Sequence, residues 1–457
     1  YTPEWLRRLG EMSRKIVVIG ANSAGVEAAI MARKTDRDAE IMVVTDESVP
    51  TYSRCGLPFV LSGKIPSFEK LIVYPLSLYR IMKFDLRKET RATRIDTGGR
   101  AVEVETKAGE HESLEYEALV IATGASPFRP PIEGLDKKGV FTLHTLKDGE
   151  GIARAMKDAG SAAVIGAGYV GMEIADAFVT RGLKTTVINS QPTILAKTFD
   201  EDMSLEVQRR FEEKGVELVL GRRAEAILGD DRVEAVVAGE HEIPADLVIN
   251  ATGVRPNVGL AREAGIEIGV TGGIKTNRRM QTSAEDVYAA GDCAETTNPI
   301  THSPALPLLG ATAVRQGRVA GVNAAGKYST YPGALFSVVS QMLDFEVGAT
   351  GLTESWAREY GLDTIVGKIR GHTRAPYYPG AKPITVKILL ERESKQIIGG
   401  QIVGGEEVTQ RINALSLAIQ KNMCWYELVK ADTCYAPSVC EASEPIVMAA
   451  EMASRKF

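Results

Sequence analysis

The order of apolar and polar residues near the start of the chain predicts a strand, a turn, a helix and a second strand. A continuous apolar run over residues 15–19 leads into the turn Gly20-Ala-Asn-Ser-Ala-Gly25, a predicted helix over residues 26–34 and a second apolar run at 41–44. Short continuous apolar runs are typical of parallel strands buried on both faces. The pattern predicts a βαβ unit that keeps the first and third glycines of Gly-x-Gly-x-x-Gly, with Asn22 at the middle position.

The same order returns about 145 residues later in a cleaner form. A predicted strand at 161–165 leads into Gly166-Ala-Gly-Tyr-Val-Gly171, a predicted helix at 172–180 and a strand at 185–188. A single glycine-rich turn often only joins a strand to a helix, but two in the same context are a stronger signal. The chain is therefore predicted to be an α/β protein with two Rossmann-like dinucleotide-binding domains.

Two further apolar segments, residues 118–124 and 246–253, both end in Ala-Thr-Gly and predict the last strands of the two nucleotide-binding lobes. From about Tyr331 the pattern changes, and no glycine turn of the phosphate-binding type follows. This last third predicts an α+β domain. Its expected strands are residues 384–390 and 397–403, and its expected helices are residues 408–420 and 446–455.

Composition changes this picture mainly by exclusion. The 457 residues are 44% hydrophobic and 25% charged, and the net charge of −5 gives nucleic acid no broad basic surface. No apolar run reaches the ~20 residues that span a bilayer. Residues 1–11 look like an extension without the apolar stretch of a signal peptide. We therefore expect a cytoplasmic protein with neither nucleic acid nor membrane as a partner.

The cysteine count favours reactive or buried thiols over a disulfide scaffold. An odd number of cysteines spread over a long chain is not typical of a disulfide framework. The five cysteines are Cys55, Cys293, Cys424, Cys434 and Cys440.

Each glycine turn is predicted to hold one dinucleotide. A helix N-terminus at such a turn presents backbone N–H groups and a positive dipole end to a pyrophosphate. An acidic residue about 20 positions further on usually binds the ribose. Asp46 is the candidate in the first unit, whereas the second unit has Asn189-Ser190, with neither an acid nor an arginine. The choice between NADH and NADPH therefore stays open.

A third element is the strand that delivers Gly291 and Asp292 at its end. A carboxylate in this position suits a hydrogen bond with a ribitol hydroxyl of FAD. The alternative is an ordinary strand followed by an acidic turn, and the two dinucleotide turns upstream favour the flavin.

The segment of residues 51–63 reads Thr-Tyr-Ser-Arg-Cys-Gly-Leu-Pro-Phe-Val-Leu-Ser-Gly. Together with the two glycine turns and Gly291-Asp292, it completes a set of motifs whose order along the chain is typical of one superfamily. With them the chain resembles the pyridine nucleotide-disulfide oxidoreductase superfamily. Within it, the chain is similar to the single-cysteine branch of coenzyme A disulfide reductases, NADH oxidases and NADH peroxidases. The resemblance covers essentially all of residues 14–457.

The resemblance implies two cofactors, FAD and NADH or NADPH, and three domains. The expected FAD-binding domain is discontinuous, comprising residues 12–120 and 248–328. Residues 121–247 would bind NAD(P)H, and residues 331–457 would form a dimerisation domain. The residues expected to bind the cofactors are Gly20, Asn22, Ala24, Gly25, Asp46, Ala122, Thr123, Gly124, Gly166, Gly168, Tyr169, Val170, Gly171, Glu173, Gly253, Gly291 and Asp292.

Cys55 is the predicted redox-active residue. Two-cysteine members of the superfamily have a second cysteine five positions later, where this chain has Val60. Cys55 would therefore cycle through a mixed disulfide, a persulfide or a sulfenic acid. Its reactive form is the thiolate, which a helix N-terminus or a nearby positive charge would favour.

Four further roles follow from the resemblance alone. Tyr169 matches an aromatic residue that covers the flavin until nicotinamide displaces it, and Glu173 matches an acid near the nicotinamide. Tyr435 matches a tyrosine that reaches the active cysteine of the other subunit, and Tyr378 is similar to another such contact. The phenols would hydrogen-bond a leaving thiolate or supply its proton. A homodimer with shared active sites is expected if these roles hold.

The substrate is less sharply defined than the reaction. Peroxide-reducing relatives have a histidine where this chain has Ser23, which lowers the case for a peroxidase or a water-forming oxidase. Coenzyme A needs cationic partners for its phosphates, and Arg33 and Lys34 are placed for this by resemblance. Around Tyr74, however, the chain lacks the lysine that coenzyme A disulfide reductases often have. Ser23, Arg33 and Lys34 are the expected substrate contacts.

Cys434 and Cys440 flank Tyr435, and the family pattern requires neither. They are either a relay that passes electrons from Cys55 to a bulkier disulfide or two small residues in a packed terminus. Cys293 and Cys424 are expected to be buried residues of the core.

The leading prediction is an NAD(P)H-dependent reductase of small disulfides, persulfides or polysulfide, with coenzyme A disulfide as the first candidate. One alternative is an NADH oxidase that reduces oxygen to peroxide or water. Another is an electron-transfer subunit or redox sensor that serves a protein partner. No metal site is expected.

Overall fold

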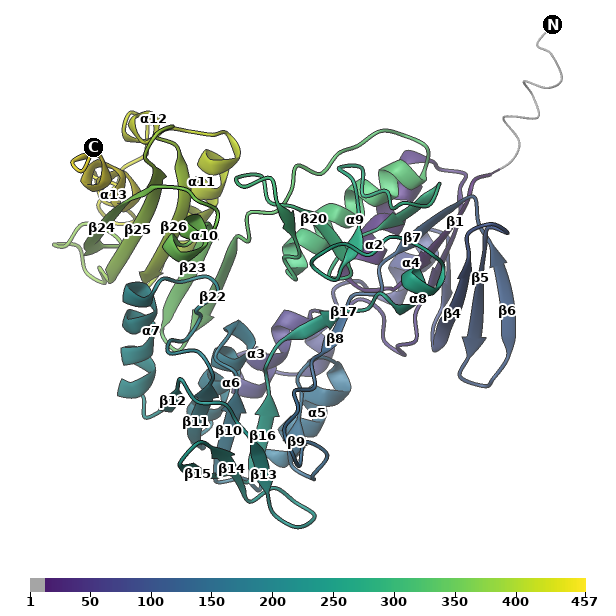
Figure 1. Cartoon of the computed structure of the whole chain (residues 1–457), viewed down its shortest axis with the longest axis horizontal. Helices are drawn as coiled ribbons and strands as arrows, with labels where there is room; N and C mark the ends of the chain where they lie inside the picture. The colour runs from purple at the N-terminus through teal and green to yellow at the C-terminus, as the bar shows by residue number, and fades with distance from the viewer. Residues whose placement is uncertain (1–12) are drawn as a thin grey trace, which may run out of the picture. The chain divides into compact units, whose positions relative to one another are not determined.

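The computed structural model describes residues 13–457 (Figure 1). The predicted extension at residues 1–11, and the first residue of the predicted FAD-binding domain, lie outside the described residues. Internal contacts divide the chain into two compact units. The first unit comprises the residues up to Cys55, Glu69–Ser126 and Val254–Ala334, and the second comprises Gly56–Phe68, Pro127–Gly253 and Leu335–Phe457.

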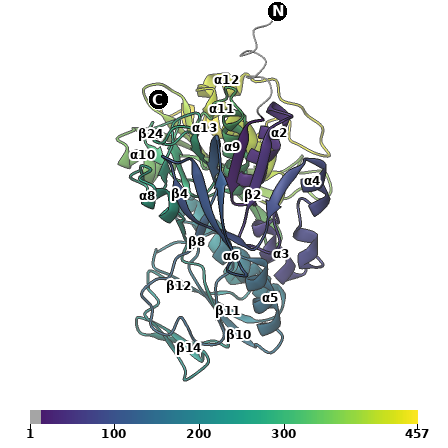
Figure 2. The same ribbon diagram turned by 90° about the vertical axis from the view of Figure 1, so that its right-hand side faces the viewer.

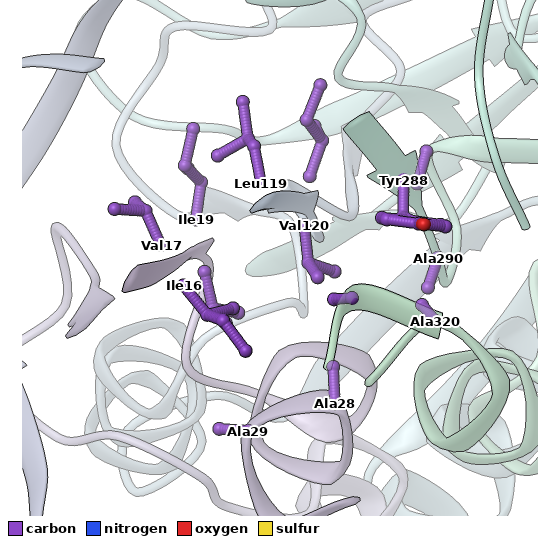
Figure 3. Close-up of a cluster of buried hydrophobic side chains, with 14 of the residues drawn as sticks. Ile16, Val17, Ile19, Ala28, Ala29, Leu119, Val120, Tyr288, Ala290 and Ala320 are labelled. Carbon is purple, nitrogen blue, oxygen red and sulfur yellow. The ribbon is translucent and has the colours of Figure 1, made fainter. Parts of the chain in front are cut away.

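A five-stranded sheet of order β19-β7-β1-β2-β3 forms the centre of the first unit, and every neighbouring pair is parallel. Its central strands are almost entirely apolar and buried, as expected for a sheet covered on both faces. Figure 3 shows Ile16 and Val120 from this sheet near Ala28 and Ala320 from two helices. The strands are β1 (Lys15–Ile19), β2 (Glu40–Val44), β3 (Phe84–Arg87), β7 (Ala118–Ile121) and β19 (Val287–Ala289).

Helices α2 (Ser23–Thr35) and α9 (Gly310–Ala324) of the first unit lie side by side (Figures 1 and 2). A Cβ on Gly317 would lie 2.2 Å from the carbonyl oxygen of Ala24, and one on Gly321 would lie 2.1 Å from that of Ala28. Because real Cβ atoms never approach so closely, the two glycines allow the helix backbones to touch. The contact holds the first half of α2 against the second half of α9.

The remaining elements of the first unit frame this core. An antiparallel three-stranded sheet is made of β4 (Thr90–Asp96), β5 (Ala101–Thr106) and β6 (His111–Glu115). The shorter elements are η2 (Phe68–Leu71), α4 (Leu76–Ile81), β8 (Ala125–Pro127), β17 (Val254–Pro256), α8 (Gly259–Glu263), β18 (Ile274–Lys275), β20 (Ala294–Thr297) and β21 (Pro304–Ala305); η2 and β8 run across a boundary between the units.

The second unit contains a second parallel sheet with the same plan, of order β12-β11-β10-β16-β9. A three-stranded antiparallel sheet again accompanies it, so the repeat predicted from the two glycine turns extends through the whole lobe. The strands are β9 (Val140–Phe141), β10 (Ser161–Ile165), β11 (Lys184–Asn189), β12 (Glu217–Leu220), β13 (Ala226–Leu228), β14 (Ala235–Ala238), β15 (His241–Pro244) and β16 (Leu247–Asn250). The helices are α3 (Leu57–Ser62), α5 (Leu146–Ala155), α6 (Tyr169–Thr180) and α7 (Glu201–Glu213).

The C-terminal part of the second unit is a five-stranded antiparallel sheet of order β22-β23-β26-β25-β24 with helices against it. This arrangement confirms the predicted α+β character of the last third. The strands are β22 (Val338–Met342), β23 (Phe345–Gly351), β24 (Thr364–His372), β25 (Pro383–Glu391) and β26 (Ile397–Gly404). The helices are α10 (Glu354–Glu359), α11 (Val408–Gln420), α12 (Trp425–Val429) and α13 (Pro445–Ser454).

The predicted fold class is confirmed, and the predicted strands and helices lie where the sequence pattern placed them to within a few residues. The division into three domains stays a prediction. By contacts, the nucleotide lobe of residues 127–253 and the C-terminal sheet belong to one unit, together with Gly56–Phe68. Within residues 13–457, no helix is long and apolar enough to cross a membrane.

Candidate functional site

The first glycine turn has a backbone shape that only glycine tolerates. Gly20 has a φ of +110°, and a Cβ there would lie 2.2 Å from the carbonyl oxygen of Ala122. A Cβ on Gly25 would lie 1.8 Å from the carbonyl oxygen of Gly20. The turn therefore presses the start of α2 against the ends of two neighbouring strands, which is the arrangement that presents helix N–H groups to a phosphate.

Asn22 supplies a direct test of whether this turn fits a dinucleotide. Its Oδ1 accepts the N–H of Ser23 at 2.8 Å and caps α2. Its Nδ2 is buried and has no hydrogen-bond acceptor among the described residues. A buried amide without an acceptor costs free energy, and a phosphate oxygen of FAD would satisfy it. The turn, including the closely packed Ala24, thus fits the predicted cofactor.

Other predicted FAD contacts gather around the same sheet edge in the first unit. Gly291 has a φ of +85° and donates its N–H to the Gln316 side chain at 2.9 Å. Burial raises the pKa of Asp292, against the opposing effect of Arg54. A hydroxyl donor such as a ribitol oxygen would stabilise this carboxylate.

The loop after β7 and the acid after β2 complete this set. Thr123 donates its hydroxyl to the carbonyl of Asn257 at 2.7 Å, and Asn257 donates its backbone N–H to the carbonyl of Gly124 at 2.9 Å. These bonds hold residues 122–124 at the end of the strand. Asp46 is exposed beyond β2, as a ribose contact would be.

Cys55 lies in the short 3-10 turn Arg54–Gly56, and its side chain is exposed. A Cβ placed on Gly310 would lie 4.0 Å from the Cys55 sulfur. Gly310 is the first residue of α9, a helix of 15 residues. The positive end of a helix favours a nearby thiolate over a thiol. The start of α9 therefore provides the helix N-terminus that the sequence led us to expect.

Arg54, the cation next to Cys55 in the sequence, forms an ion pair with a carboxylate. Its guanidinium pairs with the carboxylate of Glu47 and lies 5.2 Å from the centre of the Tyr52 ring. Because an adjacent carboxylate compensates most of its charge, we assign the main stabilisation of a Cys55 thiolate to the helix.

The second glycine turn repeats the geometry of the first within the second unit. Gly166 has a φ of +108°, and a Cβ on Gly171 would lie 1.9 Å from the carbonyl oxygen of Gly166. Cβ atoms on Gly168 and Gly253 would meet nothing within 4 Å. Tight packing at the first and last glycines, with open space at the middle one, is what close approach of a pyrophosphate requires.

Tyr169 and Val170 begin α6, and Glu173 follows one turn later. Val170 is 46% exposed, and burial raises the pKa of Tyr169 above its usual range. Burial also raises the pKa of Glu173 to about 7, although the Ser340 hydroxyl donates a hydrogen bond to Glu173 at 2.6 Å and opposes the shift. A carboxyl that titrates near neutral pH is suited to hydrogen-bond a neutral amide.

The two predicted tyrosines lie on loops of the second unit, and their roles at the active cysteine stay a prediction. The hydroxyl of Tyr435 is 3.2 Å from that of Tyr377, a residue that the sequence analysis did not single out. This hydrogen bond raises the pKa of Tyr435. Tyr435 is 52% exposed and Tyr378 is 39% exposed. The Tyr435 phenol therefore keeps its proton at neutral pH.

Of the predicted substrate contacts, Lys34 lines a pocket and Arg33 does not. Three nitrogens of Arg33 donate to the carbonyl oxygens of Met82, Arg37 and Lys83 at 2.9, 2.7 and 3.2 Å. The pocket, of about 230 Å³, is lined by Glu27, Ile30, Lys34, Tyr74, Leu78, Met82 and Arg318. Ser23 lies beside Asn22 at the start of the same helix.

The other cysteines differ in their surroundings. Cys293 is fully buried, as expected, and its sulfur lies 3.4 Å from the carbonyl oxygen of Ala290. The expectation that Cys424 is buried was wrong, because it is the partly exposed N-cap residue of α12. Its backbone N–H donates to Glu427 at 2.7 Å, so a capping role rather than core packing explains its place.

Comparison with known proteins now identifies the family. The family model described as pyridine nucleotide-disulphide oxidoreductase matches residues 14–317. The chain belongs to this family. The family's dimerisation domain matches residues 339–446 and confirms the predicted homodimer. Because the family uses FAD and NAD(P)H, the predicted cofactors and the predicted class of oxidoreductase are confirmed.

The chain is similar to relatives whose names give different activities. The chain is 40% identical to an NADH oxidase of Methanocaldococcus jannaschii, over 97% of this chain and 99% of that protein. It is 38% identical to a CoA-dependent NAD(P)H sulfur oxidoreductase of Pyrococcus abyssi, with the same coverage of 97% and 99%. Among solved structures, an NAD-dependent persulfide reductase from A. fulgidus superposes with a TM-score of 0.94 at 37% identity, covering 97% of this chain and 83% of that one.

Proposed function

We propose that this protein is an FAD-dependent NAD(P)H reductase of small disulfides, persulfides or polysulfide, with Cys55 as its redox-active residue. The single observation that carries the proposal is the exposed Cys55 beside the start of α9, with Val60 at the position of a second cysteine. Because Val60 replaces the second cysteine, the disulfide of two-cysteine members cannot form here, so the oxidised form of Cys55 would include a sulfur atom from the substrate.

The reaction begins when the Cys55 thiolate attacks the substrate disulfide RS–SR. The S–S bond breaks, one thiol leaves with a proton, and a mixed disulfide Cys55–S–SR forms. FAD, which the first glycine turn with Asn22 and Asp292 would hold, would supply an electron pair from NAD(P)H. Reductive cleavage of the mixed disulfide would return Cys55 to its thiolate form and release the second thiol with a proton. By the family resemblance, the exposed Tyr435 of the other subunit is the proposed proton donor, and its phenol carries the proton at neutral pH.

Two cations in the pocket of the first unit support a phosphorylated substrate such as coenzyme A disulfide or its persulfide. Lys34 and Arg318 both line the pocket, and Glu27 holds Arg318 through a bond of 2.8 Å from Nε. Tyr74 lies in the segment that lacks the lysine of coenzyme A disulfide reductases, and it donates its hydroxyl to Glu27 at 2.8 Å. Because Glu27 compensates much of the charge of Arg318, Lys34 would supply the net positive charge and Arg318 further N–H donors for the nucleotide phosphates.

Both nucleotides are proposed as electron donors. Asn189, at the end of β11, accepts the N–H of Ala167 at 3.3 Å and donates to the carbonyls of Gln191 and Thr193 at 3.2 and 3.0 Å. Its side chain is therefore neutral and used to hold the loop. With no carboxylate there to repel a 2′-phosphate, we expect NADH and NADPH to be accepted.

Anaerobic oxidation of NADH and of NADPH, with and without coenzyme A disulfide, tests the proposal. We expect rapid oxidation that depends on the disulfide, loss of this turnover in Cys55→Ser with FAD still bound, and normal turnover in Cys424→Ser. Turnover that occurs only in air would instead make the protein an oxidase, which the relative named NADH oxidase keeps as a possible outcome. Undiminished disulfide reduction by Cys55→Ser would refute the role of the cysteine. We also propose a cytoplasmic location, because an odd number of cysteines spread over a long chain is not typical of a disulfide framework.

A further inference from the structure

The carboxyl group of Glu173, which the resemblance places near the nicotinamide, is held by a residue of the C-terminal sheet. Ser340, in the middle of β22, donates its hydroxyl to Oε1 of Glu173 at 2.6 Å. Both residues belong to the second unit. Ser340 is only 6% exposed, so water does not compete for this bond, whereas Glu173 is partly exposed and open to a ligand. A buried hydroxyl that donates to a carboxylate makes a strong, charge-assisted hydrogen bond.

A second contact fixes β22 against the helix that carries Glu173. The ammonium group of Lys64 donates to the carbonyl oxygen of Leu343 at 3.4 Å and to the carboxylate of Asp176, on α6, at 3.1 Å. Between the two contacts, Met342 is fully buried in the apolar core that α6 also lines. The hydroxyl of Ser340 is therefore a fixed donor rather than one of several positions of a mobile side chain.

The surroundings of Glu173 make this donor unusual. Burial raises the pKa of Glu173, the Ser340 hydroxyl lowers it, and the Asp176 carboxylate raises it. Neither α3 (Leu57–Ser62) nor β22 (Val338–Met342) contains a charged residue, and Lys64, which follows α3, is paired with Asp176. On α6 itself, Tyr169 has a phenol that stays neutral. Ser340 is thus the neighbour that favours the ionised form of this carboxyl group.

We propose that Ser340 is a positioning residue for nucleotide binding, which holds Oε1 of Glu173 so that Oε2 meets the carboxamide of the nicotinamide ring. The inference rests on the proposed function, in which NAD(P)H is the electron donor, and names a residue that orients it. An ionised Oε2 accepts the amide N–H, and a fixed carboxyl group fixes the orientation of the ring.

Nucleotide binding to the oxidised, FAD-loaded enzyme tests the proposal without turnover. Calorimetric titration with NAD⁺ is compared with titration with ADP-ribose, which lacks the nicotinamide. In the wild type, NAD⁺ should bind more tightly as the pH rises through about 7, because Glu173 becomes ionised, whereas the affinity for ADP-ribose should hardly change.

Ser340→Ala removes the donor that favours the ionised carboxyl. The midpoint of the NAD⁺ profile should rise by about one pH unit, which at neutral pH leaves roughly a fifth of the ionised form and weakens NAD⁺ binding about fivefold. At alkaline pH, where both enzymes are ionised, a loss of about threefold should persist because the carboxyl group is no longer held in one rotamer. Binding of ADP-ribose should be unchanged. An unaltered midpoint, or an equal loss for both ligands, would overturn the inference.

Three further variants separate the hydroxyl from the space it fills. Ser340→Thr keeps the hydroxyl and should keep the wild-type midpoint. Ser337→Ala is the matched control, because its hydroxyl lies 2.7 and 3.0 Å from those of Thr350 and Ser416, and it should bind both ligands normally. Glu173→Gln should bind NAD⁺ with little dependence on pH. A Ser340→Thr profile equal to that of Ser340→Ala would show that the hydroxyl is not the active group and would refute the assignment.

Steady-state kinetics give a second readout. In Ser340→Ala the KM for NADH should rise about fivefold at neutral pH, and the KM for coenzyme A disulfide should not change. An equal rise in both constants would indicate a general defect and contradict a positioning role. Failure of the proposed function is recognised separately, because Cys55→Ser would then still reduce coenzyme A disulfide, while the binding of NAD⁺ to the oxidised enzyme does not depend on that reaction.

Discussion

Lys387 offers a sharp test of how the second unit is held together. It lies in the middle of β25 with 2% of its side chain exposed. Its ammonium group is 2.7 Å from Asp202, 3.0 Å from Asp200 and 2.5 Å from Glu354. Asp200 is the N-cap residue of α7, so one cation joins the nucleotide lobe to the C-terminal sheet.

The magnitude follows from the balance between burial and these three carboxylates. Burial opposes the charge, but the hydrogen bonds to Asp202 and Glu354 outweigh it and raise the pKa of Lys387 to about 12. Against a usual value of 10.5, this rise stabilises the charged folded form by about 2 kcal/mol. The stabilisation is fully present below a pH of 10.5 and is lost as the pH rises towards 12. Removing the cation costs more, about 3–5 kcal/mol, because it leaves the acids facing one another.

The test is thermal unfolding of the FAD-loaded Lys387→Met variant at neutral pH. For a unit of this size about 1 kcal/mol corresponds to roughly 2 °C, so the midpoint should fall by about 6–10 °C. The difference should shrink at mildly acidic pH, where the unpaired carboxylates become protonated. Arg392→Met is the matched control. It breaks the exposed 2.7 Å pair with Asp363 and should shift the midpoint by no more than about 2 °C. A wild-type midpoint for Lys387→Met, or a loss that does not depend on pH, would refute the reasoning.

Three further predictions use other parts of the chain. Burial raises the pKa of Glu173 to about 7 from 4.5, so the folded state should lose stability as the pH rises from 4.5 to about 7. The denaturant midpoint of Glu173→Gln should therefore change less with pH across this range than that of the wild type, and equal slopes would contradict the assignment. Gly321→Ala forces α2 and α9 apart, so it should lower the free energy of unfolding by about 1–3 kcal/mol and make FAD easier to release. In the control Gly259→Ala the added Cβ meets nothing within 4 Å, and neither change is expected. An unfolding midpoint of Gly321→Ala equal to that of the control would count against the close helix packing. Arg318→Ala should raise KM for coenzyme A disulfide about tenfold with little change in kcat, and an unchanged KM would remove Arg318 from the phosphate site.

Local patterns sufficed for most of the fold, because strands and glycine turns depend on neighbouring residues. The steric need for Gly25, for example, arises within one βα turn, where a Cβ would lie 1.8 Å from the carbonyl oxygen of Gly20. Contacts between distant segments had no local signal. Nothing near Cys55 in the sequence points to Gly310, which is brought beside it by the packing of α9 against α2.

The same limit explains the differences at the candidate site. Arg33 is expected at the substrate by resemblance, but carbonyl oxygens of Met82 and Lys83 accept hydrogen bonds from its guanidinium, and no sequence pattern indicates these contacts. The hydrogen bond between Tyr377 and Tyr435 also has no signal in the sequence, because loop residues have no fixed side-chain period.

The sheet of the first unit has a consequence for how the protein is made. Strand β19 pairs with β7 at one edge, yet about 165 residues separate the two in the chain, including the whole nucleotide lobe. On a ribosome that adds roughly 5–20 residues per second, β7 would wait on the order of 10–30 s for its neighbour. During that interval an apolar strand has an unpaired edge, which invites pairing with another chain. We therefore expect chaperone capture or slowed synthesis between β7 and β19 to affect the yield of folded enzyme more than similar interventions after Ala334.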